Sequence, residues 1–155
     1  MGKQVGLDMK LYRNTGSSGT PVWDITNIVR DLTGPDSYSE ADVSVRNVGI
    51  KLTEPALRDI SIEWEMIYDD TDPDFTAIQT AYAGKVLIEL ALADGLIGTA
   101  GSVASGGTAG SHYIRIECKI LKFERTEALE GANAYAVIAK PCWSSATGPT
   151  ITTVS

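Results

Sequence analysis

Three aspartates at alternate positions are the residues of this sequence best suited to bind a metal ion. Asp70, Asp72 and Asp74, in the segment YDDTDPDF, have the spacing of the first three ligands in a helix–loop–helix calcium site. Such a loop also needs glycine at its sixth position, for a sharp turn, and glutamate at its twelfth, as a bidentate ligand. With Asp70 in first position, these places hold Phe75 and Ala81. The calcium motif is therefore incomplete.

The same aspartates fit the start of a helix better. Asp72 has the side chain of an N-cap, Pro73 suits the first helical position, and Asp74 would lie at the positive end of the helix dipole. Gly84 suits the position just after the last turn. Apolar residues follow at helical spacing in a stripe of Phe75, Ile78 and Tyr82, with Ala77 and Ala81 beside it. We predict one helix here and no metal ion.

The remaining reactive side chains do not form a recognisable catalytic set. His112 is the only histidine, and Cys118 and Cys142 form no Cys-x-x-Cys pair. Cys118 falls in an alternating apolar pattern and is expected to be buried. Glu63 and Glu65 share one face of a strand, where exposed carboxylates would both ionise rather than act as an acid and a base. We expect no enzyme and no cofactor.

The overall charge of the chain argues against a nucleic-acid reader. The 155 residues carry 20 acidic and 13 basic side chains, a formal net charge of −7. Readers of nucleic acid usually show a basic surface that neutralises phosphates. No apolar run reaches about 18 residues, and the first residues lack the apolar core of a signal peptide. We expect one domain over residues 1–155, made in the cytoplasm and not bound to a membrane.

Alternating apolar and polar residues predict that strands dominate the fold. The clearest case is residues 59–68, where Ser61, Glu63 and Glu65 point away from a core face made of Ile60, Ile62, Trp64, Met66 and Tyr68. In residues 112–125 the alternation changes phase after Ile120, which suggests a β-bulge. Further strands are expected over residues 7–12, 22–32, 85–93 and 133–140, which gives six or seven strands around one helix.

Two polar stretches lack a face for a core, and a polar tail follows at the end of the chain. Residues 33–57 are only partly strand-like and predict a projecting hairpin or a long loop. Residues 94–111 hold six glycines and lack the Gly-Lys-Ser/Thr of a phosphate loop, so we expect a mobile surface loop. Residues 144–155 form a polar tail that is either loose or adds a strand to a partner.

In their order along the chain, these features resemble the tail tube (major tail) proteins of long-tailed bacteriophages and their prophage relatives. The matching elements are the opening GKQVGLDMKLYRNTGSSGTPVWDITNIVRDLT, the polar segment with EADVSVR, the strand DISIEWEMIYDD, the helix DPDFTAIQTAYAG and the late ILKFERTEALEGANAYAVIAKP. Two departures are NVGIKLTEPALRD, where a loop containing Gly-Trp is expected, and the glycine-rich insertion at residues 94–111.

The resemblance implies a mainly β fold, a two-sheet β-sandwich or barrel with one flanking α-helix. It also implies hexameric rings that stack into the hollow tube of a virion tail, through which DNA passes transiently and without specific binding. The implied partners are further copies of the chain together with tail terminator, tape-measure and baseplate-type proteins. Synthesis would take place in the bacterial cytoplasm, and no cofactor would be needed.

The tube also suggests two sets of site residues. An acidic inner wall would repel DNA phosphates, and the candidates for this lumen face are Ser61, Glu63 and Glu65. Polar strands without a core face would form contacts between subunits if neighbouring subunits cover them. The candidate contacts between subunits on this arm are Tyr38, Glu40, Asp42, Ser44, Arg46 and Lys51.

Two other classes of protein stay open. A tube component of a contractile injection or secretion system would share the fold and differ in its cargo. A monomeric β-sandwich that binds a ligand would need an aromatic platform or a convergent carboxylate cluster, and Trp23, Trp64 and Trp143 are scattered along the sequence. Of these three, Trp64 is expected to face inward.

Overall fold

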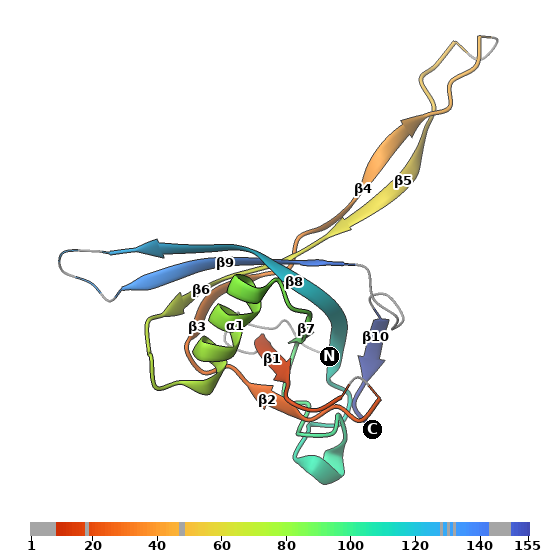
Figure 1. The fold of residues 1–155 in the computed structure, drawn as a ribbon. Helices are drawn as coiled ribbons and strands as arrows, with labels where there is room; N and C mark the ends of the chain where they lie inside the picture. The colour runs from red at the N-terminus through yellow and green to blue at the C-terminus, as the bar shows by residue number, and fades with distance from the viewer. Residues whose placement is uncertain are drawn as a thin grey trace.

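Figure 1 shows the computed structural model, which describes residues 9–17, 19–46, 49–127, 129, 131, 133–142 and 150–155. The mainly β class with one α-helix is confirmed. The elements are β1 (Lys10–Asn14), β2 (Trp23–Ile25), β3 (Val29–Thr33), β4 (Asp36–Asp42), β5 (Thr53–Ile60), β6 (Ile62–Ile67), α1 (Pro73–Gly84), β7 (Ile88–Ala93), the short 3-10 helix η2 (Val103–Ser105), β8 (His112–Thr126), β9 (Ala134–Pro141) and β10 (Thr150–Thr153).

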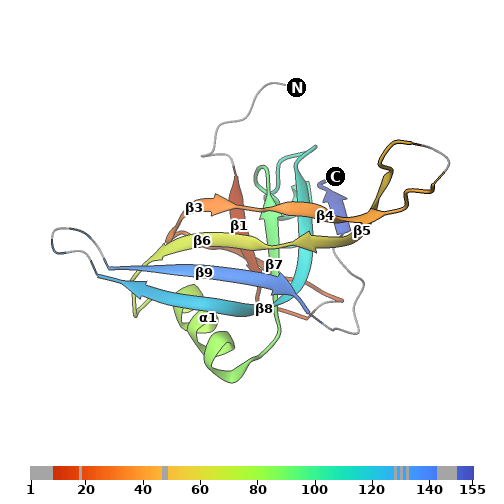
Figure 2. The same ribbon diagram turned by 90° about the horizontal axis from the view of Figure 1, so that it is seen from above.

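The two sheets are of very different size. The body is one antiparallel sheet in the order β2-β1-β7-β8-β9-β6-β3, with β10 paired to the start of β8, and the second sheet is the pair β4-β5. β8 joins the halves of the large sheet, because its first part pairs with β7 and its second part with β9. The register with β9 shifts between Ile120 and Lys122, which confirms the predicted bulge. The sheet curves over itself around β8 (Figure 1, Figure 2).

Because the sheet curves, side chains from its two ends meet in one core. Leu11 of β1 and Trp64 of β6 are 1% and 3% exposed and belong to the same apolar cluster. Cys118 lies in it too, fully buried, and burial raises the pKa of its thiol. The inward orientation of Trp64 and the burial of Cys118 are thus as predicted. The other members are Ile60, Ile62, Met66, Phe75, Ile78, Ala81, Leu90, Ile116, Ile120, Tyr135, Val137 and Ala139.

The strand expected over residues 59–68 is interrupted at Ser61. Ile60 ends β5 in the small sheet, and Ile62 begins β6 in the large one. The expected inward side chains are buried as far as Met66, but Tyr68 is 43% exposed, so its predicted burial is wrong. β6 ends at Ile67, and beyond it the Tyr68 ring lies at the rim of the core against Phe75, at 5.3 Å between ring centroids.

α1 begins where the Asp-Pro-Asp sequence expects it. The carboxylate of Asp72 accepts hydrogen bonds from the N–H groups of Asp74 and Phe75, at 2.8 and 3.3 Å. The predicted stripe holds for Phe75 and Ile78, whereas Tyr82 is 43% exposed and stacks on Phe123 at the helix edge. The end of the helix differs from the prediction as well. Gly84 is still helical, and Lys85 takes the left-handed cap conformation, with φ 54°.

The glycine-rich residues 94–111 pack against the body. The expectation that they lack apolar contacts is wrong, because Ile97 is fully buried. It lies in a second apolar cluster with Tyr12, Trp23, Ala91, Ala93, Tyr113 and Val154. Backbone hydrogen bonds also hold the stretch, among them Trp23 N–H to the Thr99 carbonyl at 2.8 Å. A Cβ on Gly107 would lie 2.7 Å from the Ile97 carbonyl oxygen, so this close approach requires glycine.

The observed bounds of some other strands differ from the expected ones. Residues 22–32 form two strands, β2 and β3, instead of one. Residues 7 and 8 of the strand expected over 7–12 lie outside the described residues, as do residues 144–149 of the polar tail. Residues 150–153 form β10 on the chain's own β8, and Val154 is 2% exposed. The described end of the tail thus adds a strand to the chain's own sheet.

Candidate assembly surface

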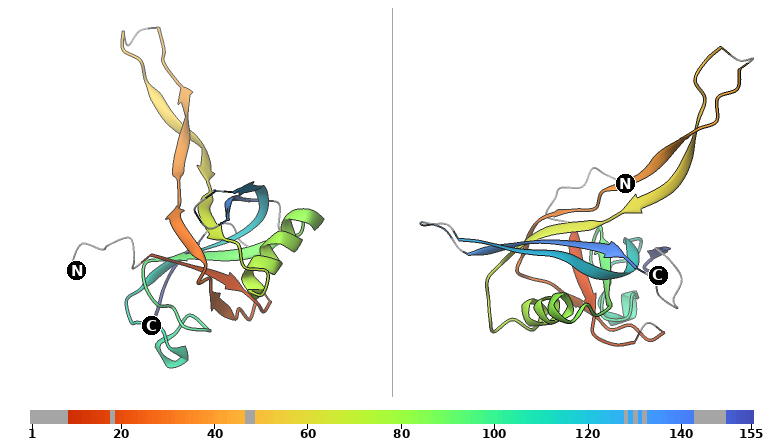
Figure 3. Two further views of the ribbon diagram at one scale, coloured as in Figure 1. Left: turned by 90° about the vertical axis from the view of Figure 1, so that its left-hand side faces the viewer. Right: turned by 45° about the horizontal axis from the view of Figure 1, so that its top comes forward.

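A two-stranded hairpin projects from the body (Figure 1, Figure 3). This arm consists of β4, β5 and the described residues 43–46 and 49–52. The strands pair from Asp36 opposite Ile60 to Asp42 opposite Thr53, with a register shift between Tyr38 and Glu40. Where the pairing of β4 with β5 is irregular, side chains accept hydrogen bonds from backbone N–H groups in place of backbone carbonyls. Leu57 N–H donates to Ser39 Oγ at 3.1 Å, and Leu52 N–H donates to Ser44 Oγ at 2.7 Å.

The root of the arm is well fixed. Arg58 donates from Nε to Asp36 Oδ1 at 2.8 Å and from a terminal nitrogen to Oδ2, and this pair lowers the pKa of Asp36. Ser61 N–H donates to the Pro35 carbonyl at 3.0 Å. A Cβ on Gly34 would lie 2.5 Å from the end of the Leu92 side chain, so a larger residue at this position would have to displace that side chain.

Beyond its root the arm is exposed, and its exposed side chains are not all polar. The contact residues expected from the sequence are all exposed on it: Tyr38, Glu40, Asp42, Ser44, Arg46 and Lys51. Sequence reasoning missed four apolar residues among them, namely Val43 at 44%, Val45 at 59%, Ile50 at 64% and Leu57 at 81% exposed. The alternation of Val43 with Val45 was the available signal. Four exposed apolar side chains on one projecting element favour a surface that another molecule covers.

The outer sheet face is the second candidate surface. It comprises the side chains of β3, β6, β9 and the second half of β8 that point away from the core. Glu63 and Glu65 lie on it, both half-buried, with Glu65 opposite Arg30 and Glu63 opposite Ile138. Its further charged side chains are Lys119, Lys122, Glu124 and Lys140.

Two features of this face differ from the simplest expectation. Ser61 is only 8% exposed, because it lies at the root of the arm, so it contributes little to the exposed surface of this face. The face is also not uniformly acidic. Arg30 donates to Glu65 from Nε at 3.0 Å, and Lys122 forms an ion pair with Glu124 at 3.1 Å. Acidic residues that are close in the sequence lie on different parts of the structure. Glu54 lies on the arm, whereas Asp69 to Asp74 lead into α1.

The three aspartates that open α1 do not converge. Asp70 is exposed, Asp72 caps the helix, and Asp74 turns into the body, where Arg13 Nε donates to its carboxylate at 2.8 Å. Burial raises the pKa of Asp74 to about 6, an effect that Arg13 opposes and the Asp24 carboxylate adds to. Among the described residues, no three His, Cys, Asp or Glu side chains are grouped so that they could hold a metal ion.

The single histidine belongs to a local contact. His112 Nδ1 lies 3.6 Å from an Asp94 carboxylate oxygen, and the His112 N–H donates to the other oxygen at 2.7 Å. Cys142 is partly exposed, and burial raises the pKa of its thiol. Within the part of the chain that the structure describes, no helix is long and apolar enough to cross a membrane.

Solved structures share this fold. The chain aligns with a subunit of the SPP1 tail tube at a TM-score of 0.69 and 14% identity, over 89% of this chain and 75% of that one. The chain has the tail-tube fold. It also aligns with the tail of a gene transfer agent particle, refined with C6 symmetry, at a TM-score of 0.67 and 15% identity, over 97% and 99% of the two chains.

A third match of the tail-tube fold is the baseplate of the anti-feeding prophage, symmetrised six-fold, at a TM-score of 0.52 and 7% identity over 93% and 90% of the chains. No family model matches the sequence, and no curated protein matches it. The shared feature is therefore the backbone path of the tail-tube fold, while few side chains are shared.

Proposed function

We propose that the chain is a structural subunit that forms hexameric rings, which stack into the hollow tail tube of a phage or a phage-derived particle. The observation that carries this proposal is the arm, a projecting hairpin with exposed apolar side chains on a body of the tail-tube fold. An arm that binds a different surface of the next copy makes a heterologous contact. Contacts of this type generate closed rings or continuous helical assemblies.

In this proposal the residues 1–155 act as one domain in the virion tail. Its partners are further copies of the chain and the terminator, tape-measure and baseplate-type proteins that complete a tail. The subunit is made in the bacterial cytoplasm and does no catalysis. The arm residues Tyr38, Glu40 and Asp42, with Ser44, Arg46 and Lys51, contact neighbouring subunits.

The outer sheet face, with Glu63 and Glu65, lines the channel. It carries both acids and bases, and some of them are paired, as in the contact of Arg30 with Glu65. A wall of this composition presents little net charge, so DNA phosphates pass without strong attraction. Six-fold repetition places many copies of this face along the path of the DNA, and salt limits the reach of each charge to about 8 Å.

A double charge reversal tests the channel assignment. Glu63→Lys with Glu65→Lys is expected to leave the subunit folded and the tubes intact, and to make the tubes retain DNA until the salt concentration is raised. Asp70→Lys with Glu127→Lys makes the same change in net charge at exposed positions away from the outer sheet face. Equal DNA retention by both variants would place Glu63 and Glu65 outside the channel.

A tube component of a contractile injection system is the second candidate, supported by the likeness to the anti-feeding prophage baseplate. Both candidates predict the same rings. They differ in what the assembled particle carries, so nuclease-protected DNA in purified particles favours the phage tail and its absence favours the injection system.

A further inference from the structure

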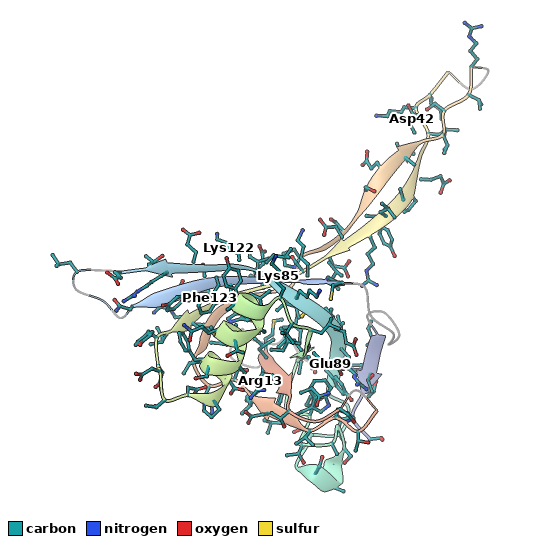
Figure 4. The ribbon with its side chains drawn as sticks, viewed as in Figure 1. Arg13, Asp42, Lys85, Glu89, Lys122 and Phe123 are labelled. Carbon is teal, nitrogen blue, oxygen red and sulfur yellow. The ribbon has the colours of Figure 1, made fainter. Side chains whose placement is uncertain are left out.

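Two lysines face each other at the arm end of the outer sheet face. Lys119 of β8 and Lys140 of β9 are direct cross-strand partners. The residues beside them, Cys118 and Ala139, are 0% and 1% exposed in the core, so both lysine side chains point to the opposite side of the sheet. Figure 4 shows Lys122, the next lysine along β8, on the side of the strand that faces away from α1. We define Lys119 and Lys140 as the lysine pair.

The two like charges of the lysine pair lie close together. The Cβ atoms of direct cross-strand partners are about 5 Å apart, and like charges in such positions destabilise a sheet. Lys140 does contact an acid, since its Nζ lies 3.4 Å from an Asp59 carboxylate oxygen, but the two side chains are 41% and 69% exposed. Exposed ion pairs contribute little to stability, so another anion can replace Asp59. The lysine pair therefore favours the binding of an anion.

Three glutamates lie further from the arm on the same face. Glu124 of β8 and Glu65 of β6 both lie opposite Ala136 of β9, and Glu63 precedes Glu65 by two positions. Lys140 and Ala136 are four positions apart on β9, which is about 13 Å at the rise of an antiparallel strand. Salt limits the reach of an exposed charge to about 8 Å. An anion at the lysine pair is thus repelled only weakly by the glutamates.

We propose that the lysine pair contacts the backbone phosphates of DNA in the channel, while the glutamates keep the duplex from adhering along the whole wall. This inference rests on the proposed function, in which the outer sheet face lines the channel, and it assigns a ligand to one part of that face. A duplex carries a phosphate about every 1.7 Å of its axis, so phosphates are near the lysine pair at any position of the DNA. Such contacts are independent of sequence, weaken with salt and allow DNA to slide, which is compatible with its passage.

Neutral variants of the lysine pair test this contact. Lys119→Gln with Lys140→Gln is expected to leave the tubes intact and to lower their affinity for a short fluorescent DNA duplex about tenfold at low salt. The salt dependence of binding should fall by about one counterion for each lysine removed. Sedimentation of the duplex with the tubes, over a range of salt concentrations, measures both quantities. Lys119→Arg with Lys140→Arg keeps both charges and should bind the duplex as the wild type does.

Lys85→Gln with Arg125→Gln is the matched control. It also removes two positive charges close to β8, but on the side of the helix, because Lys85 lies at the end of α1 and Arg125 lies over the ring of Tyr68 at 6.0 Å. This variant should bind the duplex as the wild type does. Equal losses of affinity in the two variants would attribute binding to net charge rather than to the lysine pair, and would overturn the inference.

A single substitution separates binding from folding. Lys119→Gln relieves the repulsion from Lys140, so the Tm of the subunit should not fall, while the salt dependence of DNA binding should fall by about one counterion. Wild-type tubes that bind no duplex at low salt, or glutamine variants that match the wild type in affinity and salt dependence, overturn the inference and leave the proposed function standing. Wild-type protein that forms no rings or tubes at any concentration overturns both.

Discussion

At the scale of single residues, neighbouring aspartates perform different tasks. Asp69 accepts hydrogen bonds from Thr71, Asp72 caps α1, and Asp74 meets Arg13 inside the body. The alternate spacing of Asp70, Asp72 and Asp74 would place their side chains on one side, like a set of metal ligands, only if the chain were extended. At the start of a helix each residue turns by about 100°, which sends successive side chains in different directions.

The cap makes a measurable contribution. Asp72→Ala leaves the N–H groups of Asp74 and Phe75 without their acceptor, and we expect the free energy of unfolding to fall by about 0.5–2 kcal/mol. Urea denaturation measures this change, with Asp70→Ala as the control at an exposed position. Equal stability of the two variants would show that the cap is dispensable. Titration with calcium is expected to give no saturable heat in either protein.

Burial of the Asp74 carboxylate makes stability depend on pH, and the contact with Arg13 opposes this effect. The folded-state pKa of Asp74 is about 6, above its ordinary value of 3.8, so the folded chain holds a proton that the unfolded chain has lost. This group's contribution therefore falls as the pH rises through that window. Arg13→Met leaves the buried carboxylate beside Asp24 without its cation, and we expect a loss of about 3 kcal/mol at pH 7.

At pH 5 the loss in Arg13→Met should be smaller, because a protonated Asp74 needs no cation. Arg30→Met, which breaks the more exposed pair with Glu65, should lose less than about 1 kcal/mol at both pH values. Chemical denaturation of both variants at the two pH values makes the comparison. An equal loss in Arg13→Met at pH 5 and pH 7 would contradict the account.

Local sequence predicts some of these residues and not others. The cap at Asp72 depends on three adjacent residues, so the sequence contains what is needed to place it. The pairing of Arg13 with Asp74 spans 61 positions and depends on how β1 passes the start of α1, for which no local pattern exists. The exposed Val43 and Val45 of the arm were visible in the sequence, but a period-two pattern usually indicates a buried face.

At the scale of elements, the arm is separable from the body. Its described residues from Ser37 to Asp59 are exposed apart from half-buried Ala41 and Leu52, so they contribute little to the core. Deleting residues 38–52 joins Ser37 to Thr53, and residues 53–58 can then serve as the turn before Asp59. We expect a folded subunit with a nearly unchanged Tm that forms no tubes, measured by calorimetry and electron microscopy. Loss of the fold would instead show that the arm supports the core.

The strands of the body could be predicted from period-two alternation, and the bulge after Ile120 from its change of phase. The break at Ser61 could not, because Ile60 and Ile62 continue the same alternation while they belong to different sheets. The packing of the glycine-rich residues 94–111 could not be predicted for a related reason. A single residue, Ile97, anchors it, and one apolar side chain among glycines forms no pattern.

At the scale of the whole molecule, the shape of the monomer favours assembly. The body encloses its own core, whereas the arm exposes apolar side chains that no part of the described chain covers. Composition alone gave the net charge but not its distribution. The acids that are dense between Glu54 and Asp74 in the sequence are divided among the arm, the outer sheet face and the start of α1, so no single surface carries them all.

The central claim is that copies of this chain assemble into tubes, either alone or as the main component. Electron microscopy of the purified 155-residue chain over a range of concentrations tests it most directly. The account predicts rings and tubes with six-fold symmetry, in which the arm of each subunit lies on a neighbouring subunit. Particles that remain single 16.5 kDa subunits at every concentration, or an assembly in which the arms contact nothing, would contradict it.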